Sequence, residues 1–391
     1  MTKCNRPTLD VTISPDGNFR ICCYGTTLGN IEGQTIREFF NSDAVKEISN
    51  TLNSGTRHSY CSACWNLEDL GHDSYRLVSE PYKSEGGFPA MLDIKFNNIC
   101  NLACKMCDPV SSSKLATEWK QLGWTDQNTP YLDTNSKTIL PDWQNTNYQT
   151  NKINKIWDEI IDNIKFVKRI KFTGGEPFMT KEILQFLKRI PVEDRKHIDL
   201  AWTTNGTQDL SNWESTLLTF KKNSIGISCD GEQDTYNYIR YPGTWTEWLE
   251  SSKKIMDKYQ SHINFTVTVF NIFNLKKFVS WAQSNGYLNK LRFAYENIPL
   301  VYAPMVLPRY LRVRAVEDIM YAIKNMDKSE VRTQLRAIAD HLHSINDDVH
   351  NKHWHHFLKI THQQDKHRDM SITNIWPDVP EVRERKLPNT A

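Results

Sequence analysis

Apolar and polar positions along the chain predict strands and helices that alternate. From residue 91 on, short runs of β-branched and aromatic residues are separated by longer stretches with apolar residues at helical spacing. The predicted strands are 91–97, 168–173, 198–204, 224–229, 263–269 and 290–296, and the predicted helices are 111–122, 152–164, 181–190, 211–222, 232–258 and 274–285. Repeated strand–helix units form a parallel sheet with right-handed crossovers. Six units are too few for an eight-stranded barrel, so we predict an α/β fold, a partial (β/α)6 TIM-like barrel.

The two ends of the chain have other patterns. Residues 10–23 predict two short strands joined by a Pro-Asp-Gly turn, and an amphipathic helical stretch follows. A stretch rich in turn formers, 79–90, separates this part from the barrel. From residue 301 the pattern is helical, with one apolar face made of Val313, Val316, Met320, Ile323 and Met326. We therefore predict a small N-terminal β-hairpin and helix domain (1–88), the barrel (89–300) and a C-terminal helical extension (301–391), with a polar surface insertion at 123–150.

Composition excludes several classes of protein. The 391 residues include 48 Lys and Arg against 46 Asp and Glu, a net charge of +2, which gives no general attraction to nucleic acid or to an acidic membrane. No apolar run approaches the roughly 18 residues of a membrane-spanning helix, and the first ten residues lack the apolar stretch of a signal peptide. We expect a cytoplasmic protein, in which disulfides are rare.

The distribution of cysteine points to metal binding. Eight of the nine cysteines lie in the first 107 residues, and three of these fall within "CNLACKMC", residues 100–107, directly after a predicted strand. Clustered thiols in a reducing compartment usually bind metal. A zinc site typically uses two separated pairs of ligands, whereas three thiolates on one tight loop suit a cubane iron-sulfur cluster with one iron left uncovered.

A second motif lies at the end of the next predicted strand. "KFTGGEPF" places Gly174, Gly175 and Glu176 on the same rim of the predicted barrel as the cysteine loop. Glycines allow the backbone to approach a ligand closely, and a glutamate there can pair with an ammonium group. The two motifs resemble the CxxxCxxC and GGEP signatures of radical S-adenosylmethionine (SAM) enzymes, in the same order and each after a strand.

The resemblance implies a cofactor site. Cys100, Cys104 and Cys107 would bind a 4Fe-4S cluster whose open iron holds the amine and carboxylate of SAM. Gly174, Gly175 and Glu176 would hold the methionyl amine, and Met106 would lie beside the adenine. "GISCDGEQDTYNYIRYPG" resembles the stretch that contacts the SAM carboxylate and ribose. The candidates there are Ser228, Arg240 and, assisting them, Asp230, with Asn205 of "TTNGT" as a weaker one. We interpret Cys229 as a buried core residue.

Four of the five remaining N-terminal cysteines resemble the first half of a SPASM domain, also called a twitch domain, which carries an auxiliary 4Fe-4S cluster. The pattern consists of Cys4, Gly17, Cys22 and the Cys61-x-x-Cys64 pair. It selects Cys22 as a ligand, although the adjacent Cys23 stays open. Four thiols of this kind also suit a zinc knuckle. In most such enzymes the auxiliary domain follows the barrel, whereas here it precedes it.

Other candidates have plainer interpretations. The histidine-rich segment 341–367 includes "HWHH", but Trp354 and Phe357 indicate a packed helix with a solvated histidine face. The candidates for completing the reaction chemistry are groups at predicted strand ends, Tyr295, Glu296 and Asn297, and the inward-facing Trp202. Core or rim packing also explains each of them.

The resemblance implies a radical SAM enzyme that cleaves SAM to a 5′-deoxyadenosyl radical and removes hydrogen from a substrate. The expected substrate is a peptide or protein side chain, and the auxiliary cluster accepts an electron. A small-molecule dehydrogenase is the alternative, and a non-enzymatic zinc- or cluster-binding module is the alternative of another class. The expected partners are SAM, the substrate and a flavodoxin- or ferredoxin-like reductant, without nucleic acid or membrane.

Overall fold

The structure is a computed structural model, and it describes residues 4–69, 74–77, 80–124, 146–295, 299–345 and 351–383. Most of the predicted insertion at 123–150 lies outside the described residues, as do Glu296, Asn297 and His350. Within the described part of the chain, no helix is both long enough and apolar enough to cross a membrane.

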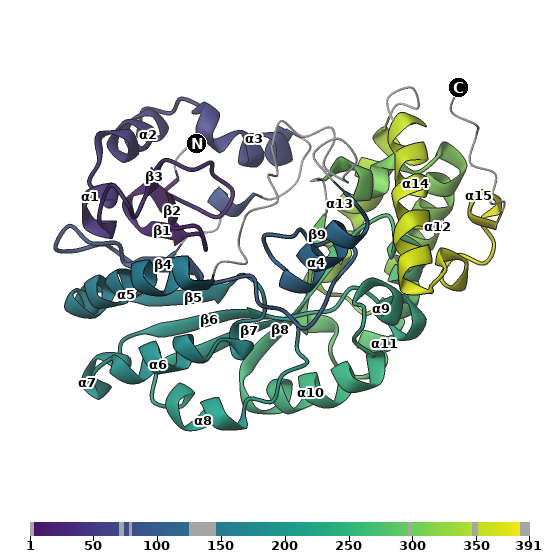
Figure 1. Cartoon of the computed structure of the whole chain (residues 1–391). Coiled ribbons are helices and arrows are strands. Elements are labelled where there is room, and N and C mark those ends of the chain that lie inside the picture. The colour runs from purple at the N-terminus through teal and green to yellow at the C-terminus, as the bar shows by residue number, and fades with distance from the viewer. Residues whose placement is uncertain are drawn as a thin grey trace.

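The central feature is a parallel sheet that does not close into a full barrel, as predicted (Figure 1). Its strands are β4 (Met91–Lys95), β5 (Arg169–Thr173), β6 (Asp199–Thr204), β7 (Lys222–Ser228), β8 (Gln260–Val267) and β9 (Leu291–Tyr295). Between them lie α4 (Ser113–Gln121), α5 (Thr146–Asp162), α6 (Lys181–Arg189), α7 (Val192–Arg195), α8 (Ser211–Leu217), α9 (Gln233–Ile239), α10 (Trp245–Lys258) and α11 (Leu275–Ser284). All six strands therefore point their carboxyl ends toward one rim.

The N-terminal strands extend the same sheet. They are β1 (Asp10–Ile13), β2 (Asn18–Arg20) and β3 (Gly29–Asn30), followed by α1 (Ile36–Phe40), α2 (Asp43–Asn53) and α3 (Ser62–Asp69). β1 pairs with β2 in antiparallel fashion and with β4 in parallel fashion, with Thr12 opposite Asp93. The result is one nine-stranded sheet in the order β3-β2-β1-β4-β5-β6-β7-β8-β9.

One predicted helix is in fact two. The sequence predicted a single helix over 232–258, but α9 ends at Ile239 and α10 begins at Trp245. Pro242 lacks an N–H and disfavours helical backbone in the residue before it, which explains the break. Backbone groups at this break bind the cysteine loop. The carbonyls of Ile239 and Tyr241 accept hydrogen bonds from the N–H groups of Lys105 (2.9 Å) and Ala103 (2.7 Å).

The C-terminal extension is helical, as predicted, and consists of α12 (Arg309–Asn325), α13 (Glu330–Ser344), α14 (Asn351–Arg368) and α15 (Pro380–Arg383). The predicted apolar face of α12 is confirmed in part. Val316, Met320, Ile323 and Met326 pack against the core, whereas Val313 is 47% exposed. The most deeply buried stripe of the helix is Leu311, Ala315, Ile319 and Ala322. This stripe includes two alanines, whose small side chains allow neighbouring helices to pack closely.

Aromatic contacts identify the side of the sheet that the helices cover. Phe172 on β5 lies against Phe186 of α6 and stacks on Trp202 of β6, with ring centroids 4.8 Å apart. Trp202 also meets Trp213 of α8 edge to face. Trp202 therefore packs against the helices, and its predicted inward orientation is wrong. Tyr295 is directed to the helices too, because its ring meets that of His341 on α13 at 5.0 Å.

Candidate functional site

The three-cysteine loop begins five residues after β4 and is held in place by the backbone that follows β5. The N–H groups of Gly175 and Glu176 donate to the carbonyls of Asn97 (3.0 Å) and Ile99 (2.7 Å). These two bonds lay the GGE segment directly beside the residues that precede Cys100. The two sequence motifs thus meet at the carboxyl-end rim of the sheet.

Both glycines are required because the GGE segment passes very close to the backbone that precedes Cys100. A Cβ on Gly175 would lie 2.2 Å from the carbonyl oxygen of Ile99, and one on Gly174 would lie 2.7 Å from that of Asn97. Gly174 also has a φ of +112°, which residues with a side chain rarely adopt. We had expected the glycines to make room for a bound ligand, and in this structure they make room for the cysteine loop itself.

Glu176 is buried beside the loop and accepts three hydrogen bonds. Its Oε2 accepts from the N–H of Asn205 (2.7 Å), and its Oε1 accepts from the hydroxyl of Thr204 (2.8 Å) and the N–H of Phe178 (3.1 Å). Burial raises the pKa of Glu176 to about 7, and these donors oppose the rise. A carboxylate has about four acceptor positions. One position on Oε2 therefore remains for a further donor such as an ammonium group.

Two of the predicted side chains contact cysteine sulfurs. The Asn205 amide nitrogen lies 3.8 Å from Cys100 Sγ and 2.8 Å from Asn101 Oδ1. The Arg240 Nη1 lies 3.7 Å from Cys104 Sγ, and its Nη2 forms an ion pair with Asp230. A hydrogen bond from Cys107 and the nearby Arg240 cation lower the pKa of Cys104 to about 7, against the effect of burial.

The remaining predicted residues differ in how far they are buried. Asp230 is fully buried and also accepts from the N–H of Thr266 at 2.8 Å, so its main contacts are with the protein. Ser228 is the last residue of β7, and Ser228 and Met106 are both half-buried, which leaves part of each side chain accessible. Cys229 is fully buried in the core, as predicted.

Sequence reasoning missed some of the residues that build this site. Thr204 was passed over in "TTNGT", although its hydroxyl binds Glu176. Lys105, between the second and third cysteines of the loop, was not singled out, yet its side chain is fully buried and ion-paired. A charged residue inside an otherwise apolar loop was the available signal.

The N-terminal cysteines converge on a separate site. Cys4, Cys22, Cys61 and Cys64 line one small pocket, together with the side chains of Arg6, Tyr24, Tyr60, Tyr75 and Arg76. Burial raises the pKa of Cys61 to about 12 and raises the pKa values of Cys4 and Cys22 as well. Metal binding here would therefore release protons.

Cys23 is directed elsewhere. It does not line the pocket of the four cysteines, and the charged groups that act on it are Lys171, Asp93, Asp10 and Lys95. Lys171 and Asp93 form an ion pair at 2.9 Å across β5 and β4. Strand side chains alternate, so Lys171 lies on the opposite face from Phe172 and the helices. Cys23 thus lies near charged side chains on the face of the sheet opposite the helices.

The donors available bear on which metal group fits. Both places present thiols, which bind zinc as well as iron-sulfur clusters. Three thiols on one loop leave one iron of a cubane without a protein ligand, whereas four thiols can bind all four irons. Among the described residues, no group of three or more His, Cys, Asp or Glu side chains is arranged to hold a single metal ion.

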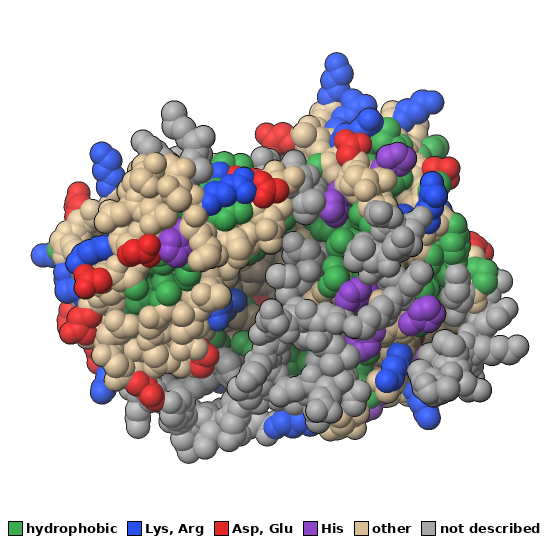
Figure 2. Space-filling view, turned by 90° about the horizontal axis from the view of Figure 1, so that it is seen from above, with side chains coloured by type: hydrophobic (Ala, Val, Ile, Leu, Met, Phe, Trp, Pro, Cys, Tyr) green, Lys and Arg blue, Asp and Glu red, His purple; other side chains and the backbone are tan. Residues whose placement is uncertain are grey.

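The histidine-rich end forms a helical surface. Trp354 and Phe357 of α14 are buried, as predicted, while His355, His362 and His367 are exposed. Figure 2 shows histidine side chains concentrated on one side of the molecule. His341 differs from the predicted solvated face, because it is buried against Tyr295.

Comparison with known proteins assigns both cysteine regions to families. The model of the radical SAM superfamily matches residues 94–283, and the model of the SPASM iron-sulfur cluster-binding domain matches residues 4–65. Residues 94–283 therefore form a radical SAM domain, and residues 4–65 form a SPASM domain. The radical SAM domain binds SAM and a 4Fe-4S cluster, and the SPASM domain brings an auxiliary iron-sulfur cluster. The SPASM match contains all four cysteines of the N-terminal pocket.

Individual relatives are more distant. A probable GTP 3′,8-cyclase from Methanocaldococcus jannaschii is 28% identical over 137 residues, which are 34% of this chain and 44% of that protein. The solved structure of anSMEcpe with bound AdoMet is 19% identical, with 61% of this chain and 59% of the other covered and a TM-score of 0.39. Streptococcus suis SuiB bound to the precursor peptide SuiA is 16% identical, with 80% and 70% covered and a TM-score of 0.37. The matches to the cyclase and to anSMEcpe thus span less than two thirds of those proteins.

Proposed function

We propose that this protein cleaves SAM reductively and uses the resulting 5′-deoxyadenosyl radical to remove hydrogen from a peptide or protein side chain. Cys100, Cys104 and Cys107 bind the SAM-cleaving 4Fe-4S cluster. Cys4, Cys22, Cys61 and Cys64 bind the auxiliary cluster, which accepts an electron from the substrate radical. Bound SAM and the cluster supply the one-electron bond cleavage, and the protein supplies orientation and exclusion of water.

One observation carries this proposal: the GGE segment is hydrogen-bonded to the backbone immediately before Cys100. This contact brings the free acceptor position of Glu176 to the same rim as the cysteine sulfurs. An ammonium group bound by Glu176 would then sit beside the loop. The Arg240 guanidinium next to Cys104 offers a cation for a carboxylate or for ribose oxygens. Two complementary charges beside one cluster loop suit the amine and carboxylate of an amino acid.

The other predicted groups have supporting roles in this proposal. Ser228 and Met106, both partly accessible, contact the ribose or carboxylate and the adenine. Asn205 orients Glu176 through its N–H and steadies Cys100 through its side chain. Asp230 holds the Arg240 guanidinium in place. The sheet and its helices shield the radical from water.

Four cysteines around the auxiliary pocket support a fully protein-ligated cluster. With no vacant iron, such a cluster serves electron transfer rather than binding of the substrate. The peptide class rests on the resemblance to enzymes with SPASM-type domains, many of which modify peptides. The match to a probable GTP 3′,8-cyclase favours keeping a small-molecule substrate as the second candidate. A flavodoxin- or ferredoxin-like protein would supply the first electron.

The test is SAM cleavage by anaerobically reconstituted protein. Wild-type protein should hold about eight irons, as two 4Fe-4S clusters, and release 5′-deoxyadenosine when reduced with dithionite. Cys104→Ala should abolish the release while leaving about four irons in the auxiliary site. Undiminished release from Cys104→Ala, or native protein that contains zinc and cleaves no SAM, would refute the proposal. The latter result would favour a non-enzymatic binding module.

A further inference from the structure

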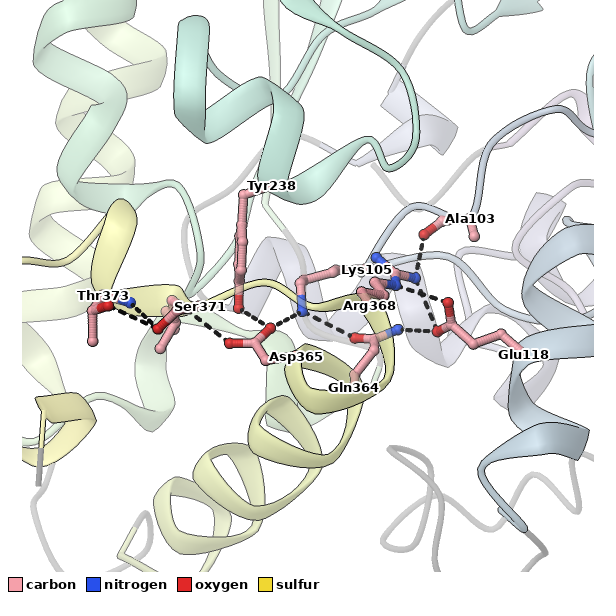
Figure 3. Close-up of polar contacts among 10 residues, drawn as sticks. Ala103, Lys105, Glu118, Tyr238, Gln364, Asp365, Arg368, Ser371 and Thr373 are labelled. Atoms are coloured by element: carbon pink, nitrogen blue, oxygen red, sulfur yellow. Dashed lines mark hydrogen bonds and ion pairs between the residues drawn. The ribbon is translucent and has the colours of Figure 1, made fainter. Parts of the chain in front are cut away.

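The loop that carries the three cysteines is tethered to the C-terminal helix α14 by a buried chain of polar contacts (Figure 3). Lys105 lies between the second and third cysteines, and its side chain is 0% exposed. Its Nζ donates to Asp365 Oδ1 at 2.7 Å and to Gln364 Oε1 at 3.3 Å, both on α14. Asp365 also accepts from the hydroxyl of Tyr238 at 2.8 Å and from the N–H of Ile372 at 2.8 Å.

A second tether reaches the other neighbour of Cys104. Arg368 of α14 donates to the carbonyl of Ala103 at 2.6 Å and, through Nε and Nη2, to both carboxylate oxygens of Glu118 on α4 (2.8 and 2.9 Å). Gln364 joins the two tethers, because its amide nitrogen donates to Glu118 at 2.6 Å while its oxygen accepts from Lys105. Residues 103 and 105 are thus both bound by α14.

The loop is also bound by the end of α9 and the residues after it. Cys104 Sγ lies near Arg240, and the N–H groups of Ala103 and Lys105 donate to backbone carbonyls of this segment. The loop is therefore clamped between two elements, the segment that contains Arg240 on one side and α14 on the other. Both clamps act on the two residues that flank the second cysteine.

The chemistry of the network indicates that it fixes the position of the cysteine loop against α14 more than it stabilises the fold. Burying two ion pairs brings little net stability compared with apolar side chains of similar size, because each charge loses its hydration. Directional hydrogen bonds, in contrast, are satisfied in only one arrangement of helix and loop. Helix α14 lies outside both family matches, which cover residues 4–65 and 94–283.

We infer that α14 positions the loop of the SAM-binding cluster, and that Lys105, Asp365 and Arg368 are the positioning residues. The inference rests on the proposed cluster ligands Cys100, Cys104 and Cys107. It has a reciprocal consequence: if docked α14 favours the loop geometry that binds the cluster and SAM, then binding of the cluster and SAM stabilises docked α14 to the same extent.

The first experiment measures the environment of the cluster in reconstituted full-length protein. Asp365→Asn and Lys105→Met should shift the electron paramagnetic resonance spectrum of the reduced SAM-binding cluster and weaken SAM binding about tenfold or more. Lys105→Met/Asp365→Leu leaves no unpaired charge but removes the directional hydrogen bonds, so it should keep the shifted spectrum and the weaker SAM binding. Recovery of wild-type values in this double variant would contradict the positioning role. Lys366→Met changes an exposed residue of the same helix and should match wild type in both measurements.

The spectrum of the auxiliary cluster is obtained from a variant with Cys100, Cys104 and Cys107 all changed to alanine, and is subtracted. If this triple variant has the wild-type spectrum, the proposed ligand set is wrong. If the ligand set holds but Asp365→Asn and Lys105→Met have wild-type spectra and SAM affinity, only the positioning role is wrong. An equal shift in Lys366→Met would also overturn it.

A second measurement needs no substitution and covers the case in which the variants do not fold. Hydrogen exchange of wild-type protein is compared before and after cluster reconstitution and SAM addition. Amides of 100–107 and of 361–368 should both slow, by about tenfold or more, while those of α12 change much less. Protection of 100–107 without 361–368, or equal protection of α12, would contradict the inference.

Discussion

The guanidinium of Arg240 lies 3.7 Å from the sulfur of Cys104 and is held there by an ion pair with Asp230. Both charged residues are buried, so each depends on the other for compensation of its lost hydration. The pair therefore links the conformation of the segment after α9 to the cysteine loop.

Replacement of Arg240 by glutamine should destabilise the protein strongly. Asp230 would keep a buried charge without a cation, and removal of one partner of a buried pair costs about 3–5 kcal/mol. Denaturant unfolding of the apo protein measures this change in the free energy of unfolding. Asp230→Asn/Arg240→Gln should be less destabilised than Arg240→Gln alone. A double variant at least as unstable as the single variant would argue against the pairing.

Replacement of Gly175 by alanine should disrupt the three-cysteine site. The added Cβ would lie 2.2 Å from the carbonyl oxygen of Ile99, so the backbone before Cys100 must move. Iron content should fall by about four atoms per chain and SAM cleavage should be lost. Gly33→Ala is the matched control, because the nearest atom to its Cβ would be 4.0 Å away. Full iron content in Gly175→Ala would show that the loop tolerates the shift.

The adjacent cysteines of the N-terminal part should behave differently. Cys22 lines the pocket with Cys4, Cys61 and Cys64, whereas Cys23 lies near Lys171 and Asp93. Cys22→Ser should therefore lose about four irons, and Cys23→Ser should keep them. Iron analysis and the spectrum of the auxiliary cluster measure the difference. Loss of iron in Cys23→Ser alone would assign the ligand to the neighbouring position.

Asp10 should make stability decrease as the pH rises. Burial, followed by the nearby Asp93, raises the pKa of Asp10 from 3.8 to about 7, so between these values the folded state holds a proton that the unfolded chain releases. The contribution is fully present below about pH 4 and is lost as the pH passes about 7.

Comparison with Asp10→Asn isolates this effect. The neutral side chain should flatten the fall in the free energy of unfolding of the apo protein between pH 4 and 8, by on the order of 4 kcal/mol. Asp234→Asn, at an exposed position in the first turn of α9, serves as the control. If the free energy of unfolding depends on pH in the same way for wild type and Asp10→Asn, then Asp10 has the same pKa in the folded and unfolded states. That result would contradict the prediction.

The sequence predicted features that depend on local spacing. The cysteine loop, the GGE segment and six strands follow from residues close together in the chain, because a turn, a strand or a ligand loop is a short-range structure. The same applies to Cys229, whose burial was predicted from the alternation of side chains along a strand. The side of the sheet that Trp202 faces could not be read in this way, because it depends on which residues of α6 and α8 pack against it.

Long-range polar contacts were also beyond the sequence. Lys105 and Asp365 are 260 positions apart. A lysine between two cysteines of the loop was a local signal, but nothing in the sequence indicated its partner. The break between α9 and α10 was signalled by Pro242, but its purpose depends on the backbone of the cysteine loop. The pairing of β1 with β4 joins segments about 80 residues apart, and the turn-rich stretch between them suggested a linker instead.

Because β1 pairs in parallel with β4, the N-terminal part is continuous with the sheet of the barrel and is not a separate domain on a flexible linker. Four successive residue pairs, from Asp10 opposite Met91 to Ile13 opposite Ile94, set the separation of the two metal centres through rigid backbone. An electron that crosses between them would meet the same tunnelling gap in every turnover. A chimaera that exchanges the N-terminal part at residues 79–90 would have to restore the β1–β4 pairing before electrons could pass between the clusters.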